Sequence, residues 1–431
     1  MPLRIAVVGS GISGMAAAWL LNQNNKVTLF EASTHLGGHA HTVDISLDGV
    51  TAPVDTGFMV FNRQTYPNLV RLFEALGITA APSEMSFSLS LEEPDLEWSG
   101  SSARTLFAQP RNLLRPDFLG MLRDILRFNR DAARAADDPA GPALGEFLAR
   151  AGYSAPFRDW YLLPMAAAIW SCPTGAVLDF PFASFARFFR NHGLLALSGR
   201  PQWYTVAGGA RLYVERMARA LPDIRLGTPV RSVRRDASGV QLLGERFDAL
   251  VLACHADQAL AILGGGADAG ERAVLGAIPY QRNRALLHTD ATLLPRRRQV
   301  WSAWNYCAGR DGPDGRPVAV HYLLNRLQPL PFGEPVIVSL NPHRAPEPRR
   351  VLGEFDYEHP VFDSRAPAAQ ARLAQLQGRR RTWYCGAWTR YGFHEDGLRS
   401  ALAVGRDFGV AAPWAQGAQR PHPGEPERAA A

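Results

Sequence analysis

Lysine is almost absent from this chain of 431 residues, since Lys26 is the single lysine among 46 basic residues and all others are arginines. The formal net charge is +6, yet no basic run coincides with a nucleic-acid recognition motif. An excess of arginine without such a motif gives no reason to predict a nucleic-acid partner.

Cysteine is also scarce. The four cysteines, Cys172, Cys254, Cys307 and Cys385, are scattered, and no two of them form a CxxC pair. The histidines are dispersed and lack the spacing of a metal-ligand cluster. This distribution predicts free thiols in a reducing, cytoplasmic compartment and no bound metal.

Long hydrophobic runs are missing as well. No segment reaches the roughly 20 apolar residues of a membrane-spanning helix. Tyr161–Trp170 is apolar, but it is short and contains Pro164, which predicts a buried helix. A hydrophobic content of 47% with 20% charged residues indicates a globular chain, long enough for two domains or one interleaved unit.

The most informative pattern lies in the first forty residues. The apolar run Ile5–Val8 predicts a buried strand, and Gly9-Ser10-Gly11-Ile12-Ser13-Gly14 follows it and opens a helix. In a dinucleotide-binding turn the first glycine permits the bend, the second lets the backbone approach the pyrophosphate, and the third packs the helix on the sheet. Glu31, at the end of the next strand, predicts a ribose contact and disfavours a 2′-phosphate, which argues against NADP.

A second glycine pair, Gly37-Gly38, follows Glu31 closely and keeps the backbone near an extended cofactor. This arrangement resembles the flavoproteins of the amine-oxidase and phytoene-desaturase group. In that group an arginine commonly follows the pair, whereas His39 stands here. Val54-Asp55-Thr56-Gly57-Phe58 resembles the loop that passes beside the flavin ring in the same group.

Two later segments extend the resemblance. Val230 matches a valine whose backbone supports the adenine, and Trp383-Tyr384-Cys385-Gly386 matches a short strand before the closing FAD motif. Asp396-Gly397 then opens a predicted helix, Leu398–Phe408. A helix N-terminus stabilises negative charge on reduced flavin, so the N–H groups of Gly397 and Leu398 are the predicted donors. Asp396 as an ordinary helix cap is an alternative.

The predicted fold class is α/β: a Rossmann-type FAD-binding domain interleaved with an α+β substrate domain that contains a mostly antiparallel sheet and a helical subdomain. The FAD-binding segments are predicted at 1–80, 201–265 and 376–412, the helical substrate segment at 81–200, the substrate sheet at 266–375 and a disordered tail at 413–431. Strands are expected near 284–288, 299–306, 317–324 and 336–340, with a further strand at 228–233.

The middle section is rich in aromatic and arginine side chains. Residues 111–136 form a predicted amphipathic helix, and a dense phenylalanine stretch follows at 180–189. One interpretation is that these aromatic residues form the core of the substrate domain. The other is that they line an apolar substrate channel or rest on a membrane surface, which predicts peripheral membrane association at the inner face.

A narrower resemblance is to a bacterial subfamily of predicted NAD/FAD-binding oxidoreductases. It is carried by Asp55-Thr56-Gly57-Phe58, Thr65-Tyr66-Pro67-Asn68, Trp304-Asn305-Tyr306 and Gly392-Phe393-His394-Glu395-Asp396-Gly397. The resemblance implies a link to enzymes that methylate or cyclopropanate unsaturated phospholipid acyl chains, and therefore a modified fatty-acyl substrate and a lipid-methyltransferase partner.

Three functions follow from these patterns. The favoured one is an FAD-dependent dehydrogenase or desaturase that moves a hydride from an apolar acyl lipid to flavin N5. A flavin amine oxidase or carotenoid-type desaturase is the second, although Lys26 is remote from any flavin ring, while amine oxidases of the group often place a lysine beside N5. Trp388 and Tyr391 could still flank an amine. A non-catalytic flavin-binding assembly factor is the third.

The candidate catalytic residues are His394, Tyr391, Tyr306 and Tyr66. Histidine can exchange a proton near neutral pH, and the alternative for His394 is a structural role in a cofactor loop. The residues predicted to bind the cofactor are Gly9, Ser10, Gly11, Ile12, Ser13, Gly14, Glu31, Ala32, Gly37, Gly38, His39, Thr56, Gly57, Phe58, Val230, Gly386, Asp396, Gly397 and Leu398.

Overall fold

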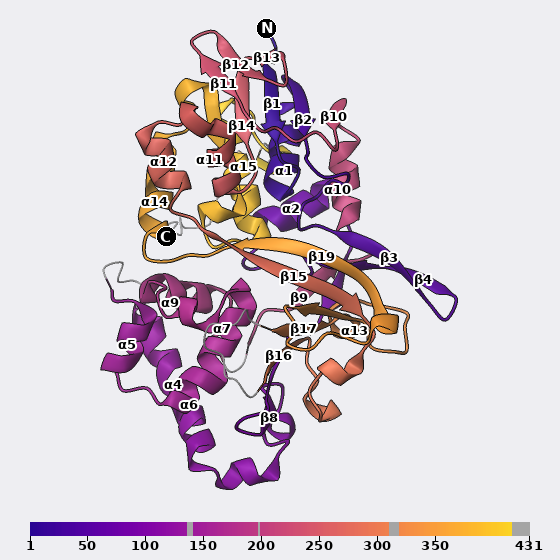
Figure 1. The fold of residues 1–431 in the computed structure, drawn as a ribbon, viewed down its shortest axis with the longest axis vertical. Coiled ribbons are helices and arrows are strands. Elements are labelled where there is room, and N and C mark those ends of the chain that lie inside the picture. The colour runs from indigo at the N-terminus through magenta and orange to yellow at the C-terminus, as the bar shows by residue number, and fades with distance from the viewer. Residues whose placement is uncertain (136–140, 197–198, 310–318, 416–431) are drawn as a thin grey trace, which may run out of the picture.

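The computed structural model describes residues 1–135, 141–196, 199–309 and 319–415. A parallel sheet with helices around it forms one end of the molecule, and a mixed sheet with a helical bundle forms the other (Figure 1). A long two-stranded ribbon runs between the two ends (Figure 1).

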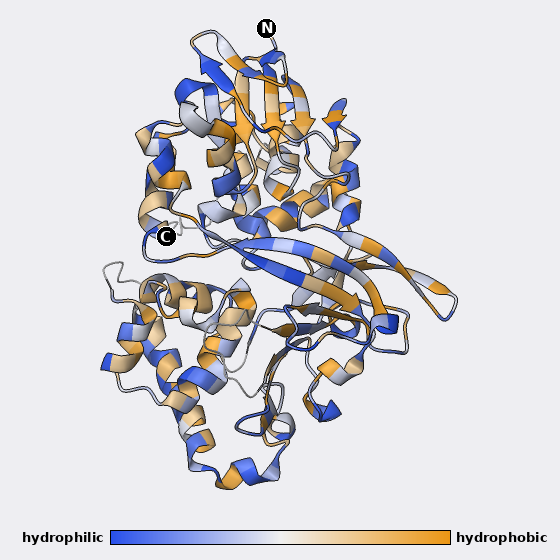
Figure 2. Ribbon diagram, in the orientation of Figure 1, coloured by the Kyte–Doolittle hydropathy of each residue, from blue (hydrophilic) through white to orange (hydrophobic). Residues whose placement is uncertain are grey.

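The parallel sheet has five strands in the order β10-β2-β1-β14-β20. Their bounds are β1 Arg4–Val8, β2 Lys26–Phe30, β10 Asp223–Arg225, β14 Ala249–Leu252 and β20 Thr382–Tyr384. The three central strands are almost wholly hydrophobic (Figure 2), as parallel strands covered on both faces must be. The sheet therefore joins segments from the start, the middle and the end of the chain.

The helices around this sheet are α1 Ile12–Leu21, α2 Pro67–Ala75, α10 Arg211–Ala218, α11 Ala256–Leu263, α12 Ala269–Leu275, α14 Ala366–Arg372 and α15 His394–Asp407. The first helix, α1, is buried along nearly its whole length because it packs against both α15 and α10.

The mixed sheet has seven strands in the order β19-β15-β18-β17-β16-β7-β8, antiparallel except where β16 pairs with β7. Their bounds are β7 Phe87–Leu91, β8 Leu96–Ser99, β15 Tyr280–His288, β16 Trp304–Ala308, β17 Val320–Leu323, β18 Ile337–Leu340 and β19 Val351–Pro360, with α13 Leu324–Leu327 after β17. Strands β15 and β19 continue beyond the sheet as the ribbon toward the parallel sheet.

Smaller strand groups complete the scaffold. They are the hairpin of β3 Thr42–Leu47 and β4 Val50–Asp55, the sheet of β5 Phe61–Asn62, β6 Ala80–Ser83 and β9 Trp203–Val206, and the sheet of β11 Arg234–Asp236, β12 Gly239–Leu242 and β13 Glu245–Phe247. Strand β9 lies between β5 and β6 and brings the chain back to the first segment after the helical bundle.

The helical bundle contains α3 Ala103–Leu106, the 3₁₀ turn Pro110–Leu114, α4 Pro116–Ala135, α5 Leu144–Arg150, α6 Ala155–Phe157, the π-helical turn Arg158–Leu162, α7 Leu163–Trp170, α8 Thr174–Val177 and α9 Phe182–Asn191. Aromatic rings form its core, since Phe128 contacts Phe157, Phe182 and Phe185 at 5.3–6.3 Å between ring centroids. The interpretation that the aromatic stretch builds a core therefore holds for these rings.

Several expected elements differ from the structure. The strand expected at 299–306 is confined to Trp304–Ala308, because a 3₁₀ turn occupies Arg298–Val300. The strand expected at 228–233 is irregular. The tail predicted as disordered begins with a 3₁₀ turn, Pro413–Ala415, in which Trp414 stacks on Trp19, and 416–431 lie outside the described residues. None of the helices in the described ranges combines the length and hydrophobicity needed to cross a bilayer.

Candidate active site

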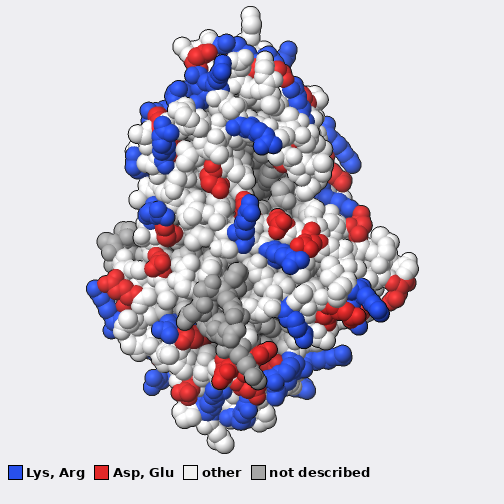
Figure 3. Space-filling model, in the orientation of Figure 1, with Lys and Arg blue, Asp and Glu red and all other residues white. Residues whose placement is uncertain are grey.

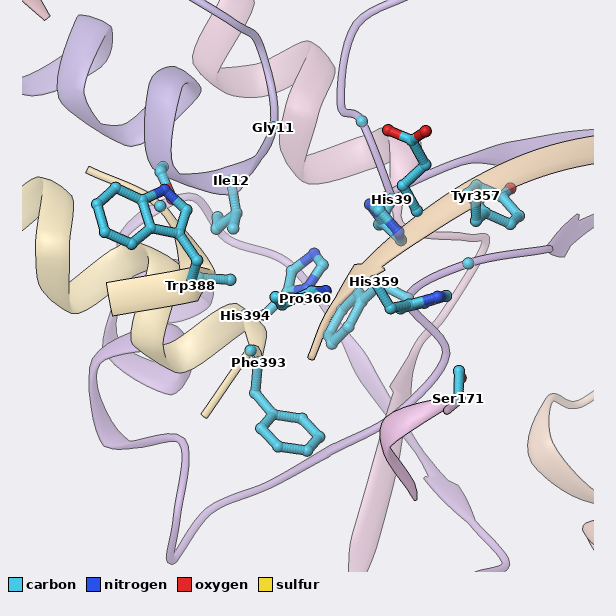
Figure 4. Close-up of a pocket in the computed structure, with 18 of the residues that line it drawn as sticks. Gly11, Ile12, His39, Ser171, Tyr357, His359, Pro360, Trp388, Phe393 and His394 are labelled. Carbon is cyan, nitrogen blue, oxygen red and sulfur yellow. The ribbon is translucent and has the colours of Figure 1, made fainter. Parts of the chain in front are cut away.

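A cavity of about 1190 Å³ is lined by residues of the parallel sheet, the β15–β19 ribbon and the helical bundle. Figure 4 shows part of its wall, with Gly11, His359 and Ser171 around it. Pockets for single drug-sized ligands span roughly 300–1,000 Å³. The cavity can therefore hold a dinucleotide together with a second ligand. Its lining begins at the carboxyl ends of β1 and β2, which is where ligands bind in open parallel sheets.

The glycine-rich turn has the geometry that close approach of a ligand requires. Gly9 has φ of +99°, a conformation that favours glycine. A Cβ on Gly14 would lie 1.8 Å from the Gly9 carbonyl oxygen, so this glycine packs the helix against the turn. A Cβ on Gly11 would meet nothing within 4 Å, which leaves open space beside the N-terminus of α1. The turn thus suits a pyrophosphate at the helix N-terminus.

Glu31 holds the turn in this shape. Its carboxylate accepts hydrogen bonds from the backbone N–H groups of Ser10 and Ser33, both at 2.8 Å, and it lines the cavity. A carboxylate has about four lone-pair positions, so two such bonds leave room for ribose hydroxyl groups.

The second glycine pair lies against the first turn. Gly37 and Gly38 have φ of +108° and +57°, and a Cβ on Gly38 would lie 3.1 Å from the Gly11 Cα. His39 follows them, and its Nε2 is buried without a hydrogen-bond partner among the described residues. Burial first, then the neighbouring imidazoles of His359 and His255, lower the pKa of His39, so the ring is neutral at pH 7.

The Thr56-Gly57-Phe58 loop packs on this segment. A Cβ on Gly57 would lie 2.3 Å from the His39 carbonyl oxygen, which in turn accepts the Phe58 N–H at 2.6 Å. The Phe58 ring stacks on His394 with centroids 3.7 Å apart and planes at 16°. This loop therefore connects the glycine turns with the N-terminus of α15.

Helix α15 begins at His394, four residues before the expected start at Leu398. The Gly397 N–H donates to the Phe393 carbonyl at 3.0 Å, so Gly397 lies inside the helix rather than at its start, and the donor role of Gly397 and Leu398 stays a prediction. The first turn instead contains His394, Glu395 and Asp396. Asp396 accepts the N–H groups of Tyr391 and Phe393, which supports the alternative that it orders the helix start.

Gly397 has a packing role. A Cβ at this position would lie 2.7 Å from Ser13 Oγ and 2.9 Å from Ile12 Cγ2, so α15 crosses α1 at this glycine. The crossing brings the first turn of α15 toward the glycine-rich turn of residues 9–14, with His394 on the cavity wall (Figure 4).

The predicted catalytic residues do not form one group. His394 Nε2 lies 3.2 Å from the Tyr213 hydroxyl, and burial lowers the pKa of His394 to about 3. The ring is therefore neutral at pH 7, which favours the structural alternative for His394. Tyr66 and Tyr391 line the cavity, whereas Tyr306 is absent from its lining, which includes its strand neighbours Trp304 and Tyr322.

The other predicted cofactor residues divide in the same way. Those that line the cavity are Gly9, Ser10, Gly11, Ile12, Ser13, Glu31, Ala32, Gly37, Gly38, His39, Thr56, Gly57, Phe58, Val230 and Gly386. Gly14, Asp396, Gly397 and Leu398 are absent from its lining. For Gly14 this agrees with the packing role that the glycine motif assigns to it.

The sequence prediction missed the residues that the ribbon contributes. Tyr357 and His359 lie on β19, with ring centroids 5.1 and 5.0 Å from that of His39 (Figure 4). His255 caps α11, stacks on Tyr280 at 4.3 Å and also lines the cavity. The alternation of Phe355, Tyr357 and His359 was the available signal. Despite these histidines, no group of three potential metal ligands occurs among the described residues.

The part of the cavity away from the glycine turns is apolar and aromatic. Its lining includes Met165, Ile169, Trp170, Phe188, Leu194, Trp203, Trp304, Tyr322, Phe362, Tyr391 and Phe393. Three carboxylates line the whole cavity within the described ranges, and each has partners. Glu31 holds Ser10 and Ser33, Glu84 pairs with Arg326 at 2.7 Å, and Glu358 pairs with Arg282 at 3.1 Å.

Residues 12–264, more than half of the chain, match the model of the flavin-containing amine oxidoreductases. The chain belongs to this family. Membership confirms the predicted FAD cofactor and the flavin-dependent oxidoreductase class. It does not confirm that the chain belongs to the narrower subfamily linked with cyclopropane-type lipids.

Individual relatives agree with the family. A carotenoid phi-ring synthase of Streptomyces griseus is 33% identical over 278 residues, which are 58% of this chain and 52% of that protein. The chain thus spans about half the length of this relative. Cyclohexylamine oxidase from Brevibacterium oxydans has a similar structure with a TM-score of 0.68, 16% identity and coverage of 95% and 100%.

A second solved structure, a fatty acid isomerase from P. acnes that produces CLA, has a TM-score of 0.66 at 17% identity, and covers 94% of this chain and 99% of its own. At these identities the likenesses establish the fold alone. They confirm the predicted Rossmann-type FAD domain with an interleaved substrate domain.

Proposed function

We propose that the protein is an FAD-dependent oxidoreductase that removes a hydride from an apolar, lipid-like substrate. FAD, when bound, accepts the hydride at N5. We assign its pyrophosphate to the open space beside Gly11 and its ribose to Glu31. The flavin then lies toward Phe58 and the first turn of α15, and the substrate occupies the aromatic part of the cavity.

The observation that carries this proposal is the chemistry of the cavity wall. A cationic amine needs an available carboxylate or an equivalent acceptor, yet the three carboxylates of the wall already have partners. Lys26 begins β2 at the amino end of the parallel sheet, remote from the cavity at the carboxyl ends. The apolar side chains that remain suit a hydrocarbon substrate, and the amine alternative rests on Trp388 and Tyr391, which also line the cavity.

Within this class we favour a modified fatty-acyl chain, which is what the subfamily resemblance implies. A carotenoid-type polyene is the second candidate, because the curated relative is named a carotenoid phi-ring synthase. We also propose a lipid methyltransferase as the partner of the protein. The domain boundaries after residues 80, 200, 265, 375 and 412 are likewise proposals. Co-purification of the tagged protein with such a methyltransferase tests the partner.

Anaerobic reduction of the purified holoprotein tests the reaction. We expect a cyclopropane fatty acid or another acyl lipid to bleach the flavin absorption, and cyclohexylamine to leave it unchanged. Trp203→Leu should slow the bleaching because Trp203 lines the cavity, whereas Trp414→Leu, at the far end of the chain, should not. Bleaching by the amine and by none of the lipids would refute the proposal.

One face of the helical bundle has the side chains expected of a surface that binds an anionic membrane. Leu119, Arg123, Leu126 and Arg130 follow one another at helical spacing on α4, and all four are exposed. Leu114, just before α4, is 88% exposed. Figure 3 shows arginine side chains around this lower end of the molecule. Apolar side chains flanked by arginines are typical of helices that lie in a membrane interface, and we propose that role here.

Vesicle flotation tests this face. The wild type should float with vesicles of phosphatidylcholine and phosphatidylglycerol, and less with phosphatidylcholine alone. Replacement of Leu114, Leu119 and Leu126 by glutamine should release the protein, whereas Leu226→Gln, at an exposed leucine elsewhere, should have no effect. Equal flotation of both variants would exclude this face as the docking site.

A further inference from the structure

A second, smaller cavity of about 310 Å³ adjoins the main one, and we refer to it as the side cavity. The two cavities share the wall residues Tyr66, Phe188, His192, Tyr391 and Phe393. The rings of this wall pack face to face, since Phe188 stacks on His192 at 3.9 Å and on Phe393 at 5.1 Å between centroids. Only one layer of side chains therefore separates the side cavity from the aromatic part of the main cavity.

The side cavity differs in chemistry from the main one. Besides the shared wall, its lining residues are Gln64, Thr65, Pro67, Asn191, Arg390, Glu395, Asp396 and Arg399. The side chains of Arg390 and Arg399 are exposed, and in the described part of the chain neither guanidinium has a carboxylate within ion-pair distance. Burial raises the pKa of Asp396, and the charges of Arg390 and Arg399 partly offset this, so both arginines lie near that buried carboxyl group without an ion pair. A polar pocket with two exposed guanidinium groups thus lies beside a hydrocarbon-lined cavity.

The two acidic residues of the side cavity are committed elsewhere. Glu395 accepts the N–H groups of Asn68 and Leu69 at the N-terminus of α2, and the Asn68 amide at 2.6 Å. Asp396 accepts two N–H groups of the preceding loop. Both carboxyl groups are buried, whereas both arginines are exposed, so an incoming anion meets the guanidinium groups first.

His192 adds no positive charge. Its Nδ1 lies 3.0 Å from the Phe188 carbonyl oxygen, which makes Nδ1 the protonated nitrogen of the neutral ring. Burial lowers the pKa of His192 to about 4. The positive charge of the side cavity therefore comes from Arg390 and Arg399, and its boundary with the main cavity is an uncharged aromatic layer.

We propose that the side cavity binds the anionic head group of the substrate, a carboxylate or a phosphate ester, through Arg390 and Arg399, and that rotation of the side chains in the shared aromatic wall lets the hydrocarbon tail into the main cavity. Guanidinium groups match the planar oxygen pairs of carboxylates and phosphates. This inference rests on the proposed function and deepens it, because it specifies an anionic amphiphile rather than a neutral polyene or a cationic amine.

Ligand titration of the holoprotein tests the inference, with the flavin absorption spectrum as the measure of binding. The probes are oleic acid, oleoyl lysophosphatidic acid and methyl oleate, each below its micelle concentration. The Arg390→Gln/Arg399→Gln double variant is compared with Arg71→Gln, which removes the same charge from an exposed arginine of α2 outside both cavities. Flavin content and thermal unfolding establish that each variant is folded.

We expect at least one anionic lipid to bind about tenfold or more tightly than methyl oleate, and the double variant to lose this preference while Arg71→Gln keeps it. The preferred anion then identifies the carboxylate or the phosphate ester as the source. Equal binding of the anionic lipids and the ester, or an unchanged double variant, would overturn the head-group site and leave the proposed function standing. Failure of all three lipids to bind would instead count against the lipid substrate itself.

Discussion

The two ends of the main cavity are built on different physical principles. The end at the glycine turns is shaped by backbone: Gly9, Gly14 and Gly38 stand where a Cβ would meet backbone atoms at 1.8–3.1 Å. The other end is shaped by aromatic and aliphatic side chains from the bundle, the mixed sheet and the loop before α15. Backbone shape tolerates little change, whereas side chains can repack around a new ligand. We therefore expect cofactor binding to be fragile and substrate choice to be adaptable.

The glycine turn offers the sharpest test of this contrast. Gly14→Ala places a methyl group where the Gly9 carbonyl lies, so we expect the free energy of unfolding to fall by about 3 kcal/mol or more and flavin to be lost. Gly11→Ala puts the same methyl group into open space, so the apoprotein should keep its stability while FAD binding weakens. Urea unfolding of the apoproteins and flavin-to-protein absorbance ratios measure both effects. Equal stability of the two variants would contradict the packing role of Gly14.

Asp55 connects segments from the two ends of the cavity, and its replacement tests how much this connection stabilises the fold. Its carboxylate accepts the Ala210 N–H at 2.9 Å and the Gln328 amide at 2.8 Å, so it links β4 to α10 and to the substrate sheet. Burial raises the pKa of Asp55 from 3.8 to about 6, which means that the folded protein binds this proton more tightly than the unfolded chain. Its contribution is full below pH 4 and is lost as the pH rises through 6, at a cost of about 2–3 kcal/mol.

Urea unfolding of the apoprotein between pH 4 and pH 7 measures this effect. The wild type should lose stability across the interval, and Asp55→Asn should lose less because it carries no proton to release. Burial also raises the pKa of Asp396 to about 6, so this residue still contributes to the pH dependence of stability in the Asp55→Asn variant. Parallel pH profiles of the two proteins would rule out Asp55 as the titrating group.

Replacement of Glu31 tests whether a polar side chain at the glycine-turn end contributes to the affinity for FAD. Glu31→Gln removes a charged acceptor from the Ser10 and Ser33 N–H groups, so we expect FAD to bind about 10- to 100-fold more weakly. Glu74→Gln, an exposed acid on α2, is the matched control. Quenching of flavin fluorescence gives both dissociation constants, and a Glu31→Gln constant equal to that of the control would remove Glu31 from the site.

The smallest effect is expected in the aromatic end. Phe188→Leu keeps an apolar side chain on the shared wall, so the FAD dissociation constant should stay unchanged while lipid affinity shifts by about tenfold or less. Parallel titrations with FAD and with oleic acid measure the two values. A loss of FAD comparable with that in Glu31→Gln would show that the two ends of the cavity are not independent.

The same contrast explains what the sequence could predict. The turn of residues 9–14 and Glu31 follow from local rules, because a glycine pattern between a strand and a helix dictates backbone geometry within thirty residues. Val230 lines the cavity as the family resemblance implies, although its segment is irregular rather than a strand. A backbone contact does not require a strand, so Val230 can line the cavity although the expected strand does not form.

One error is local, and the others arose where distant segments decide the outcome. Asp396-Gly397 looked like a helix start, but Asp396 accepts N–H groups from residues before it, and the helix begins at His394. Tyr306 shares a face of β16 with Trp304, yet the pairing partners of the strand decide which of them reaches the cavity. His359 was missed with the whole of β19, whose role depends on pairing with β15, more than sixty residues away.

The β15–β19 ribbon limits how the protein could be divided into separate fragments. The pairs from Tyr280 and Pro360 to Leu287 and Gly353 run in one register from the cofactor end of the cavity into the mixed sheet, and the register shifts only at the last pair, His288 and Val351. A cut that separated the two ends would leave these backbone groups unpaired along a long exposed edge, which invites aggregation. Relatives can therefore exchange their substrate-binding halves only if both strands of the ribbon are exchanged together. Otherwise a change of substrate specificity requires replacement of individual side chains in the cavity.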